Sequence, residues 1–258
     1  MTVLVVGASG ATGRLLVEQL LDSGLNVRVI VRSPDRLPEA LRNHENLSVI
    51  SAAVLDLSDA EMSRHVSGCS AVASCLGHNL SFKGLFGPPH RLVTDATRRL
   101  CNAIRANQHQ EPTKFILMNT TANSNRDLNE PITFGQKCVI GLLRLLLPPH
   151  VDNEKAADHL RTRIGRHDSA IEWAVVRPDN LIDEDRVTGY DVHSSPIRNA
   201  IFDAGVTSRI NAGHFMADLI TDQGTWSRWN GQMPVIYNKV QKGDEPDRES
   251  PAPPLEPT

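Results

Sequence analysis

Three glycines near the start of the chain, Gly7, Gly10 and Gly13, are spaced three residues apart. They follow an apolar run over 3–6 and precede a segment over 15–21 whose leucines recur at helical spacing. A glycine turn between a buried strand and a helix suits a dinucleotide, because backbone N–H groups and the helix N-terminus can approach its pyrophosphate. We therefore predict that Gly7 forms the tight turn, Gly10 admits the phosphates and Gly13 lets the helix pack on the strand.

A cation follows the next predicted strand, 27–31, which ends at Arg32 and Ser33. An acid at this position would accept the ribose hydroxyls of NAD, whereas a guanidinium can bind a 2′-phosphate with two hydrogen bonds. The sequence thus favours NADP(H) as the cofactor. The alternative is that Arg32, like Arg36, is an ordinary solvated cation at a strand end.

Two further strand ends carry candidate contacts to the nucleotide. Asp56 could accept the adenine amino group while the backbone of Leu57 addresses a ring nitrogen, unless Asp56 caps the following helix instead. Leu76 and Gly77 could let the backbone pass beside the ribose and pyrophosphate, and the alternative there is a plain turn glycine.

The elements that must position these residues alternate as strand and helix, which predicts an α/β fold with a Rossmann-type, doubly wound parallel sheet. We expect one domain over 1–238 with a small C-terminal substrate lobe, mainly 123–150 and 191–238, and a disordered tail over 239–258. The expected strands are 3–6, 27–31, 47–50, 71–77, 114–118, 173–176, 208–211 and 233–237, and the expected later helices include 58–65, 94–107, 153–165 and 212–219.

The composition limits the functional classes. The chain has 258 residues, of which 40% are hydrophobic and 22% charged, and its net charge of -3 gives no basic footprint for nucleic acid. No secretory signal is recognisable, and the apolar run 140–147 is too short to span a bilayer. We expect a cytoplasmic protein that binds neither a membrane nor a metal ion. No H-E-x-x-H pattern occurs, and the cysteines lack the spacing of a metal site. We expect four free thiols, at Cys69, Cys75, Cys101 and Cys138.

Together with the Thr120-Thr121 pair and the run 175–180, these motifs resemble the atypical short-chain dehydrogenase/reductases of the NAD(P)H-binding, NmrA-like type, which include flavin reductase and biliverdin reductase B-like proteins. The resemblance covers about residues 2–238. It implies that Thr121 lies beside the nicotinamide and that Pro178 meets the carboxamide. The implied cofactor-binding residues are Gly7, Ser9, Gly10, Ala11, Thr12, Gly13, Arg32, Ser33, Asp56, Leu57, Leu76, Gly77, Thr120, Lys155 and Pro178.

One departure from the wider family bears on the chemistry. Standard short-chain dehydrogenases carry Tyr-x-x-x-Lys, but here Val151 stands four residues before Lys155. The usual proton donor is missing, while Lys155 can still donate to the nicotinamide ribose or, alternatively, pair at the surface with Glu154 or Asp158. The catalytic candidates are therefore Thr121, Lys155 and His78, the last being the best placed of ten histidines.

Two long connections are expected to shape the substrate side. Residues 79–92 contain Phe82 and Phe86, which could stack on a planar ligand, and residues 123–147 include Phe134 and an apolar run. The second connection could form a lid or pocket wall, or a helix packed on the core or on a second subunit.

These features predict an NADPH-dependent oxidoreductase that reduces a small planar acceptor such as a flavin, quinone or conjugated carbonyl. The proton would come from solvent or from a neighbour such as His78. Two alternatives stay open: a non-catalytic NADP(H)-binding redox sensor of NmrA type, and an epimerase or dehydratase. The expected partner is a small-molecule substrate, and the chain is expected as a monomer or homodimer.

Overall fold

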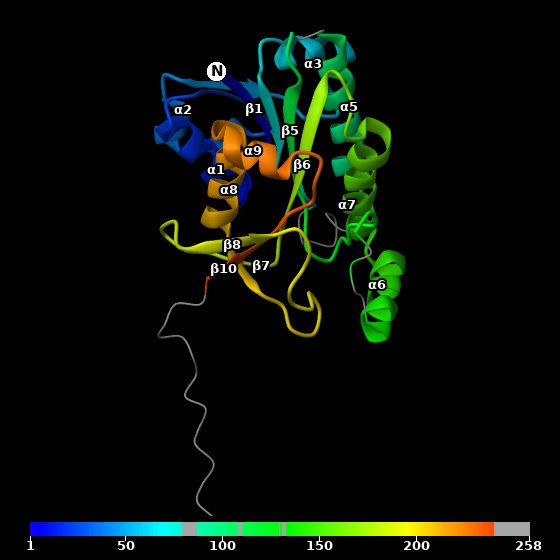
Figure 1. The fold of residues 1–258 in the computed structure, drawn as a ribbon. Coiled ribbons are helices and arrows are strands. Elements are labelled where there is room, and N and C mark those ends of the chain that lie inside the picture. Colours follow the sequence, from blue (N-terminus) through cyan, green and yellow to red (C-terminus); the bar gives the residue numbers. More distant parts are fainter. Residues whose placement is uncertain (79–86, 108–109, 129, 131–132, 240–258) are drawn as a thin grey trace, which may run out of the picture.

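The fold is built on a mainly parallel sheet of eight strands (Figure 1). The computed structural model describes residues 1–78, 87–107, 110–128, 130 and 133–239. The strand order is β3-β2-β1-β4-β5-β6-β10-β8, and β8 is the antiparallel member, paired with β10. The doubly wound α/β prediction is thus confirmed. The strands are β1 (Thr2–Val6), β2 (Asn26–Val31), β3 (Leu47–Ser51), β4 (Ala71–Ser74), β5 (Thr113–Met118), β6 (Ile171–Pro178), β8 (Tyr190–His193) and β10 (Val235–Asn238).

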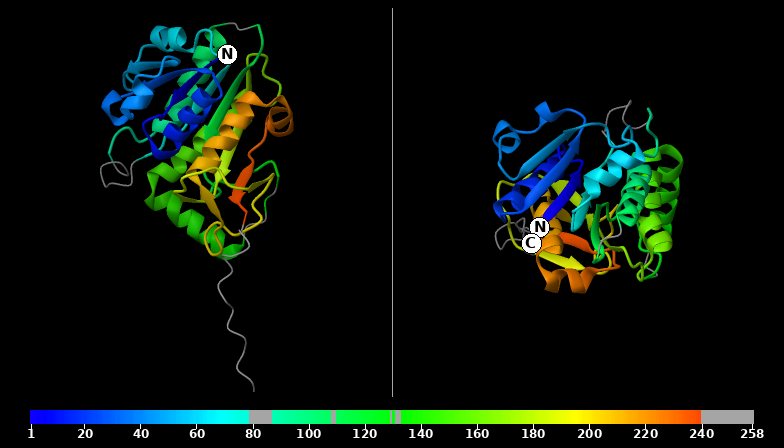
Figure 2. Two further views of the ribbon diagram at one scale, coloured as in Figure 1. Left: turned by 90° about the vertical axis from the view of Figure 1, so that its left-hand side faces the viewer. Right: turned by 90° about the horizontal axis from the view of Figure 1, so that it is seen from above.

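Helices cover both faces of the sheet (Figure 2). One face packs against α1 (Ala11–Asp22), α8 (Arg209–Thr221) and α9 (Gln223–Trp229), and the other against α3 (Asp59–Val66), α5 (Leu92–Ala106) and α7 (Pro148–His159). The short η1 (Pro34–Arg36) and α2 (Glu39–Arg42) follow β2, and α6 (Phe134–Leu146) stands at the lower corner of Figure 1.

The first strand shows why a continuous apolar run is needed. Val3 and Val5 enter the hydrophobic core under α1 and α8, whereas Leu4 and Val6 enter the core under α3, α5 and α7. Successive side chains of a strand point to opposite faces, so a strand covered on both sides must be apolar at every position.

Three predicted elements have another type or other bounds in the structure. The expected strand 208–211 is wrong, because the Ser208 hydroxyl accepts a hydrogen bond from Asn211 N at 3.2 Å and starts α8 as its N-cap. The strand there is β9 (Val206–Ser208), which pairs in parallel with β7 (Asn180–Ile182) in a separate two-stranded sheet.

The helix expected from 153 begins earlier, at Pro148, because proline fits the first turn of a helix, where its missing N–H costs nothing. After α7 the chain continues as one π-helical stretch, η2 (Leu160–Ile164), and stops at Gly165 with a φ of +72°. Fourth-strand pairing ends at Ser74 rather than Gly77, so Leu76 and Gly77 lie in the connection after β4.

The predicted tail lies outside the described residues from 240 onward, as do Phe82, Phe86 and the side chain of Phe134. Among the helices in the described ranges, none has the length and apolar character needed to cross a bilayer. The long connection 123–147 contains α6, so a helix forms in this region, as one of the two alternatives stated.

Candidate functional site

A groove of about 630 Å³ lies at the carboxyl ends of β1, β2 and β4. It contains a subset of the residues predicted to bind the cofactor, together with one predicted catalytic residue. These are Gly7, Ser9, Gly10, Arg32, Asp56, Leu76, Gly77 and His78. The other predicted cofactor contacts do not line it, namely Ala11, Thr12, Gly13, Ser33, Leu57, Thr120, Lys155 and Pro178.

The glycine turn has the backbone geometry that the spacing predicts. Gly7 has a φ of +81°, and a Cβ there would lie 2.5 Å from the carbonyl carbon of Cys75. A Cβ on Gly13 would lie 2.2 Å from the Gly7 oxygen, so α1 can approach the turn only without a side chain at this position. Gly10 N closes the turn by donating to Gly7 O at 3.0 Å.

The N-terminus of α1 opens on this groove through Ser9 and Gly10. Gly10 is the N-cap, no side chain caps the helix and the first turn holds no acid. The N–H groups of a first helical turn lack partners within the helix, and the helix dipole places partial positive charge there. The arrangement therefore suits a phosphate group.

Two exposed cations stand on the β2 side of the groove, Arg32 and Arg36. Within the described ranges neither takes part in an ion pair, in contrast to nearby Arg42, whose Nη1 lies 3.2 Å from Asp35 Oδ1. Charge without a protein partner at the end of β2 is what binding of a ribose phosphate requires.

The wall formed by residues 52–56 is held by a residue that the sequence did not single out. Arg99, on α5, donates from Nη1 to the Leu55 oxygen at 2.6 Å and from Nη2 to the Leu57 oxygen. Asp56 is exposed in the groove, whereas Leu57 is buried in the core. Helix α3 is capped by Ser58 in a capping box, so the alternative of Asp56 as its N-cap is wrong.

His78 is fixed by a carboxylate from a distant part of the chain. Its Nε2 lies 2.8 Å from Asp152 Oδ2, and only 6% of the His78 side chain and 1% of the Asp152 side chain are exposed. The same carboxylate accepts hydrogen bonds from the backbone of Val93 at 2.8 Å and Thr94 at 2.9 Å, so it also caps α5 from α7. Asp152 directly follows Val151, which occupies the position of the missing tyrosine.

Thr121 is buried and its hydroxyl is engaged. It donates to Asp179 Oδ1 at 3.0 Å, and Asp179 Oδ2 accepts from Gly205 N at 2.8 Å. Lys155 is exposed, and the acids proposed as its surface partners are paired elsewhere, Glu154 with Arg144 and Asp158 with Arg161. The roles of Thr121 and Lys155 beside a nicotinamide stay predictions.

A second charged network holds the strand end from which Pro178 projects. Arg177 has no exposed surface, and its guanidinium lies 2.6 Å from Glu130 Oε1. It also donates to the oxygens of Asn123 at 2.9 Å and Met233 at 2.7 Å. In the sequence, Arg177 is recognisable only as part of the run 175–180, because its acidic partner Glu130 lies 47 positions earlier in the chain.

Comparison with known proteins agrees with this geometry. A family model described as NAD(P)H-binding matches residues 7–223, which is most of the chain. The chain belongs to this NAD(P)H-binding family. Its fold is shared with solved structures of short-chain dehydrogenase/reductases.

Solved structures from bacteria share the fold at low identity. A short-chain dehydrogenase/reductase from Veillonella parvula in complex with NADP is 13% identical, with 95% of this chain and 98% of that chain covered and a TM-score of 0.66. A protein from Streptococcus pneumoniae named as a candidate NADH-flavin reductase is 17% identical (93% and 100% covered, TM-score 0.62). A candidate NAD-dependent epimerase/dehydratase from Bacillus halodurans is 19% identical, with 93% of this chain and 94% of that chain covered and a TM-score of 0.62. No curated protein matches the chain.

The groove of this NAD(P)H-binding protein fits a dinucleotide on the geometry of its own residues. The glycine turn, the uncapped helix N-terminus and two cations that form no ion pair within the described residues all line it. Cys75 also lines the groove, and burial raises the pKa of its thiol to about 12, so the thiol stays protonated at neutral pH. Among the described residues, no group of histidine, cysteine and acidic side chains could hold a metal ion.

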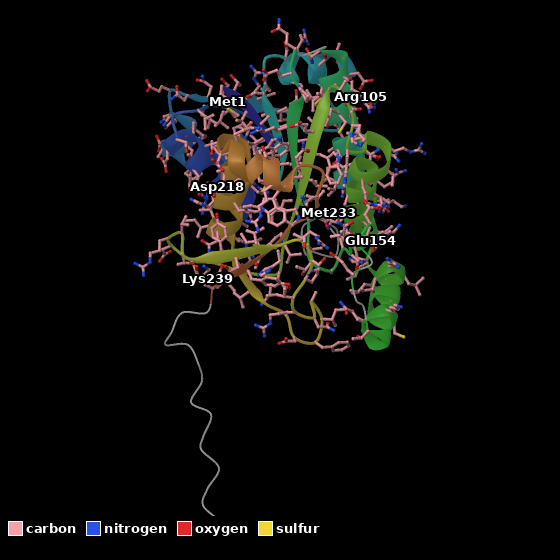
Figure 3. All side chains as sticks on the ribbon, viewed as in Figure 1. Met1, Arg105, Glu154, Asp218, Met233 and Lys239 are labelled. Carbon is pink, nitrogen blue, oxygen red and sulfur yellow. The ribbon has the colours of Figure 1, made fainter. Side chains whose placement is uncertain are left out.

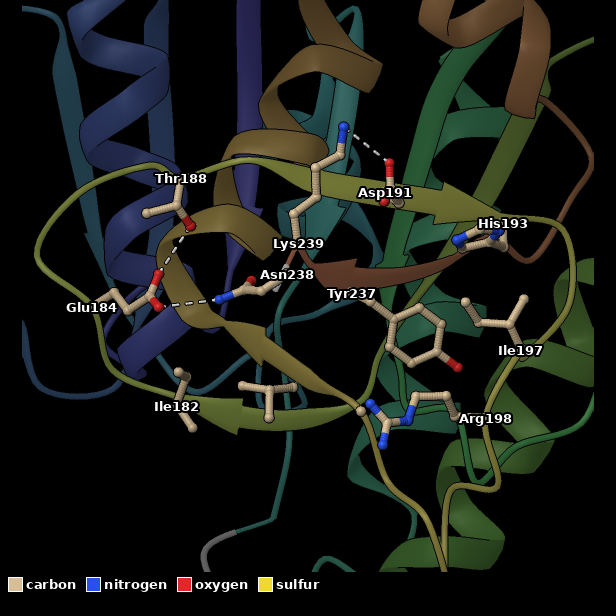
Figure 4. A pocket seen from close by; sticks show the side chains of 12 residues that line it. Ile182, Glu184, Thr188, Asp191, His193, Ile197, Arg198, Tyr237, Asn238 and Lys239 are labelled. Atoms are coloured by element: carbon tan, nitrogen blue, oxygen red, sulfur yellow. Dashed lines mark hydrogen bonds and ion pairs between the residues drawn. The ribbon is translucent and has the colours of Figure 1, made fainter. Parts of the chain in front are cut away.

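A separate hollow of about 760 Å³ lies in the C-terminal lobe (Figure 4). Glu184 and Asn238 stand at one end of it, and Tyr237 and Arg198 at the other. Tyr237 packs directly over Gly205, where a Cβ would lie 2.3 Å from the ring, and burial raises the pKa of its hydroxyl. This hollow shares no lining residue with the dinucleotide groove.

Proposed function

We propose that this NAD(P)H-binding protein is an NADPH-dependent reductase of a small planar acceptor such as a flavin, quinone or conjugated carbonyl. The observation that carries the proposal is that one groove combines a phosphate-binding turn, two cations and a buried histidine. The turn is Gly7 to Gly10, the cations are Arg32 and Arg36, and the histidine is His78. Such a combination provides both cofactor binding and a group able to exchange a proton.

Different residues of the groove would bind different parts of the cofactor. The backbone of the turn and the first turn of α1 would bind the pyrophosphate, and Arg32 with Arg36 would bind the 2′-phosphate. Asp56 would accept the adenine amino group. NADPH supplies a hydride when bound, and the acceptor needs one proton in addition.

We assign the donation of that proton to His78. Its imidazole lines the groove and is oriented by Asp152, as in other sites where a carboxylate fixes a catalytic histidine. Thr121 is less suited, because its hydroxyl already donates to Asp179. In this proposal His78 is the catalytic acid and Asp152 is a positioning residue.

The test is steady-state oxidation of NADPH across a panel of flavins, quinones and enals. His78→Gln should lower turnover by about 10²–10⁴-fold on the best acceptor, the usual range for a lost general acid, while NADPH affinity is kept. His90→Gln is the matched control, because His90 lies exposed on the segment leading to α5. Unchanged turnover in His78→Gln would assign the proton to solvent.

The cofactor preference has its own test by calorimetry. NADPH should bind about tenfold to a hundredfold more tightly than NADH, because a charge-assisted pair with phosphate contributes about 1.5–3 kcal/mol. Arg32→Ala should remove most of this preference, and Arg42→Ala, whose guanidinium pairs with Asp35, should keep it. Equal affinity of the unmutated protein for both cofactors would contradict the assignment.

A redox sensor is the competing function. It would bind NADPH in the same groove with the same preference, but no acceptor of the panel would be reduced. Tight NADPH binding together with a flat panel would favour it over the reductase.

A further inference from the structure

A single arginine, Arg99, holds the backbone on both sides of Asp56. It lies on α5, whose last turn carries Arg105 (labelled in Figure 3), and its side chain is 23% exposed. Its Nη1 donates to Leu55 O at 2.6 Å, and its Nη2 donates to Leu57 O. These two carbonyl groups belong to the residues before and after Asp56. One planar guanidinium therefore fixes the chain around this carboxylate.

The peptide unit that precedes Asp56 is anchored at both its oxygen and its nitrogen. The oxygen, from Leu55, accepts the hydrogen bond of Arg99, and the nitrogen, from Asp56, donates to Ala53 O at 2.9 Å. Because a peptide unit is planar, these two bonds set the direction in which the chain enters Asp56. On the other side, the Leu57 side chain is buried in the core, and α3 begins directly afterwards with its capping box. Asp56 thus lies between two anchored residues.

The Asp56 carboxylate itself is left available. Asp56 is exposed and lines the groove, and among the residues that the structure describes its carboxylate takes part in no ion pair or hydrogen bond. Arg99 pairs instead with Asp59, whose Oδ1 lies 3.1 Å from Nη2. A carboxylate accepts hydrogen bonds and has none to donate, so it favours an amino group over a carbonyl oxygen on the ligand.

We infer that Arg99 is the positioning residue through which the groove selects adenine, a base with an amino group at its 6-position. The inference rests on the proposed binding of NADPH in this groove, with the adenine at Asp56. Arg99 is not among the described residues that line the groove, so it acts through the backbone and not by contact with the nucleotide. It holds Asp56 in the orientation that meets the 6-amino group.

The test compares two dinucleotides by calorimetry on the full chain. One is NADPH, and the other is its analogue in which hypoxanthine replaces adenine, so that an oxygen stands in place of the 6-amino group. We call the ratio of the two dissociation constants the base preference. The unmutated protein should bind NADPH about tenfold more tightly, because a hydrogen bond to a charged group changes affinity by about this factor.

Two substitutions of Arg99 should reduce the base preference. Arg99→Met should lower it to less than about twofold, because the carbonyl groups beside Asp56 lose their donor. Arg99→Lys keeps the positive charge but offers one nitrogen in place of a rigid fork, so it should also lose most of the preference. The lysine variant keeps the inference testable if Arg99→Met does not fold. Thermal melts of both variants show how much stability is lost.

The neighbouring Arg98 provides the matched control. It is exposed on the same helix and holds none of the described carbonyl groups of residues 52–57, so Arg98→Met should keep the base preference. A role of Arg99 in stability alone would give a different result from the one expected. It would lower the affinity for both dinucleotides by the same factor and leave their ratio unchanged.

Asp56→Asn tests whether Arg99 acts through Asp56. An amide can accept a hydrogen bond from a 6-amino group or donate one to a 6-oxygen, so the base preference should disappear in Asp56→Asn. Adding Arg99→Met to this variant should change the base preference no further, because the two residues act on the same contact. A further fall in the double variant would show that Arg99 affects the base by another route.

The role of Arg99 would be overturned by an unmutated protein without base preference, by a preference that survives both Arg99 variants, or by an equal loss in Arg98→Met. These outcomes are separate from failure of the reductase proposal. A flat acceptor panel would leave the base preference and its dependence on Arg99 intact, whereas NADPH turnover without base preference would overturn only the role of Arg99. A protein that binds neither dinucleotide would overturn both.

Discussion

Arg32 and Arg36, which follow β2, are exposed and take part in no ion pair within the described residues, whereas Arg177, near the carboxyl end of β6, is buried and paired with Glu130. Arg32 is exposed and lines the dinucleotide groove. Arg177 has no exposed surface and joins Glu130, Asn123 and Met233. The first region keeps its charge available for a ligand, and the second uses its charge to hold three chain segments together. The two regions should therefore respond to substitution in opposite ways.

The largest change in stability is expected for Arg177→Met. Removing one partner leaves the Glu130 carboxylate buried and unpaired, which should lower the free energy of unfolding by about 3–5 kcal/mol in urea titrations. Arg32→Ala, at the exposed end, should change it by no more than about 0.5 kcal/mol. The double variant Arg177→Met with Glu130→Gln should recover part of the loss, since no unpaired charge remains. Equal losses for Arg177→Met and Arg32→Ala would refute the contrast.

A smaller effect is expected where the groove depends on backbone contact. In Gly13→Ala the new Cβ would lie 2.2 Å from Gly7 O, so the turn must shift, and overpacking of this kind costs about 1–3 kcal/mol. NADPH binding should weaken together with stability. Gly141→Ala is the control, because a Cβ there meets nothing within 4 Å and Gly141 does not line the groove. An unchanged thermal melt for Gly13→Ala would show that the turn is more adaptable than its geometry indicates.

Acid titration examines the paired charges between α6 and α7. Burial alone would raise the pKa of Glu154, but the neighbouring His150 imidazole, whose Nε2 lies 3.4 Å from Glu154 Oε1, and hydrogen bonds from Arg144 lower it to about 2. A lowered pKa in the folded state stabilises the protein above the ordinary value near 4.5, and this contribution is lost as the pH falls toward 2. The stability difference between the unmutated protein and Glu154→Gln, about 1 kcal/mol near neutral pH, should shrink across that window. A difference that is constant from pH 5 to about 2 would contradict the assignment.

The smallest effect on stability is expected for Lys155→Ala, because Lys155 is exposed. The free energy of unfolding should change by less than about 0.5 kcal/mol. NADPH affinity should fall by a few-fold to about tenfold if Lys155 donates a hydrogen bond to the ribose. Calorimetry with undiminished affinity would leave Lys155 as a surface lysine and confine cofactor binding to the groove.

Local patterns predicted the first region well. Each of its signals lies within a few neighbouring residues: the apolar run of β1, the glycine spacing and the cation after β2. The groove brings Gly7, Gly10 and Arg32 together as expected. The prediction of the 208–211 strand failed because Ser208 can serve either a strand or a helix N-cap, and only its hydrogen bond to Asn211 decides between them. Helix α7 began earlier than expected because Pro148 was read only as the stop of the preceding apolar run.

By itself, the sequence determined the parallel sheet, the glycine turn and the absence of the usual tyrosine, because each depends on neighbouring residues. Only the tertiary structure decided which charges are partners. His78 and Asp152 are 74 positions apart, Thr121 and Asp179 are 58 apart, and Arg177 and Glu130 are 47 apart. No local periodicity encodes such distances, since they are set by the order in which strands enter the sheet and by the helices that close over it. The choice between a free charge and a buried pair is therefore a property of the packed molecule.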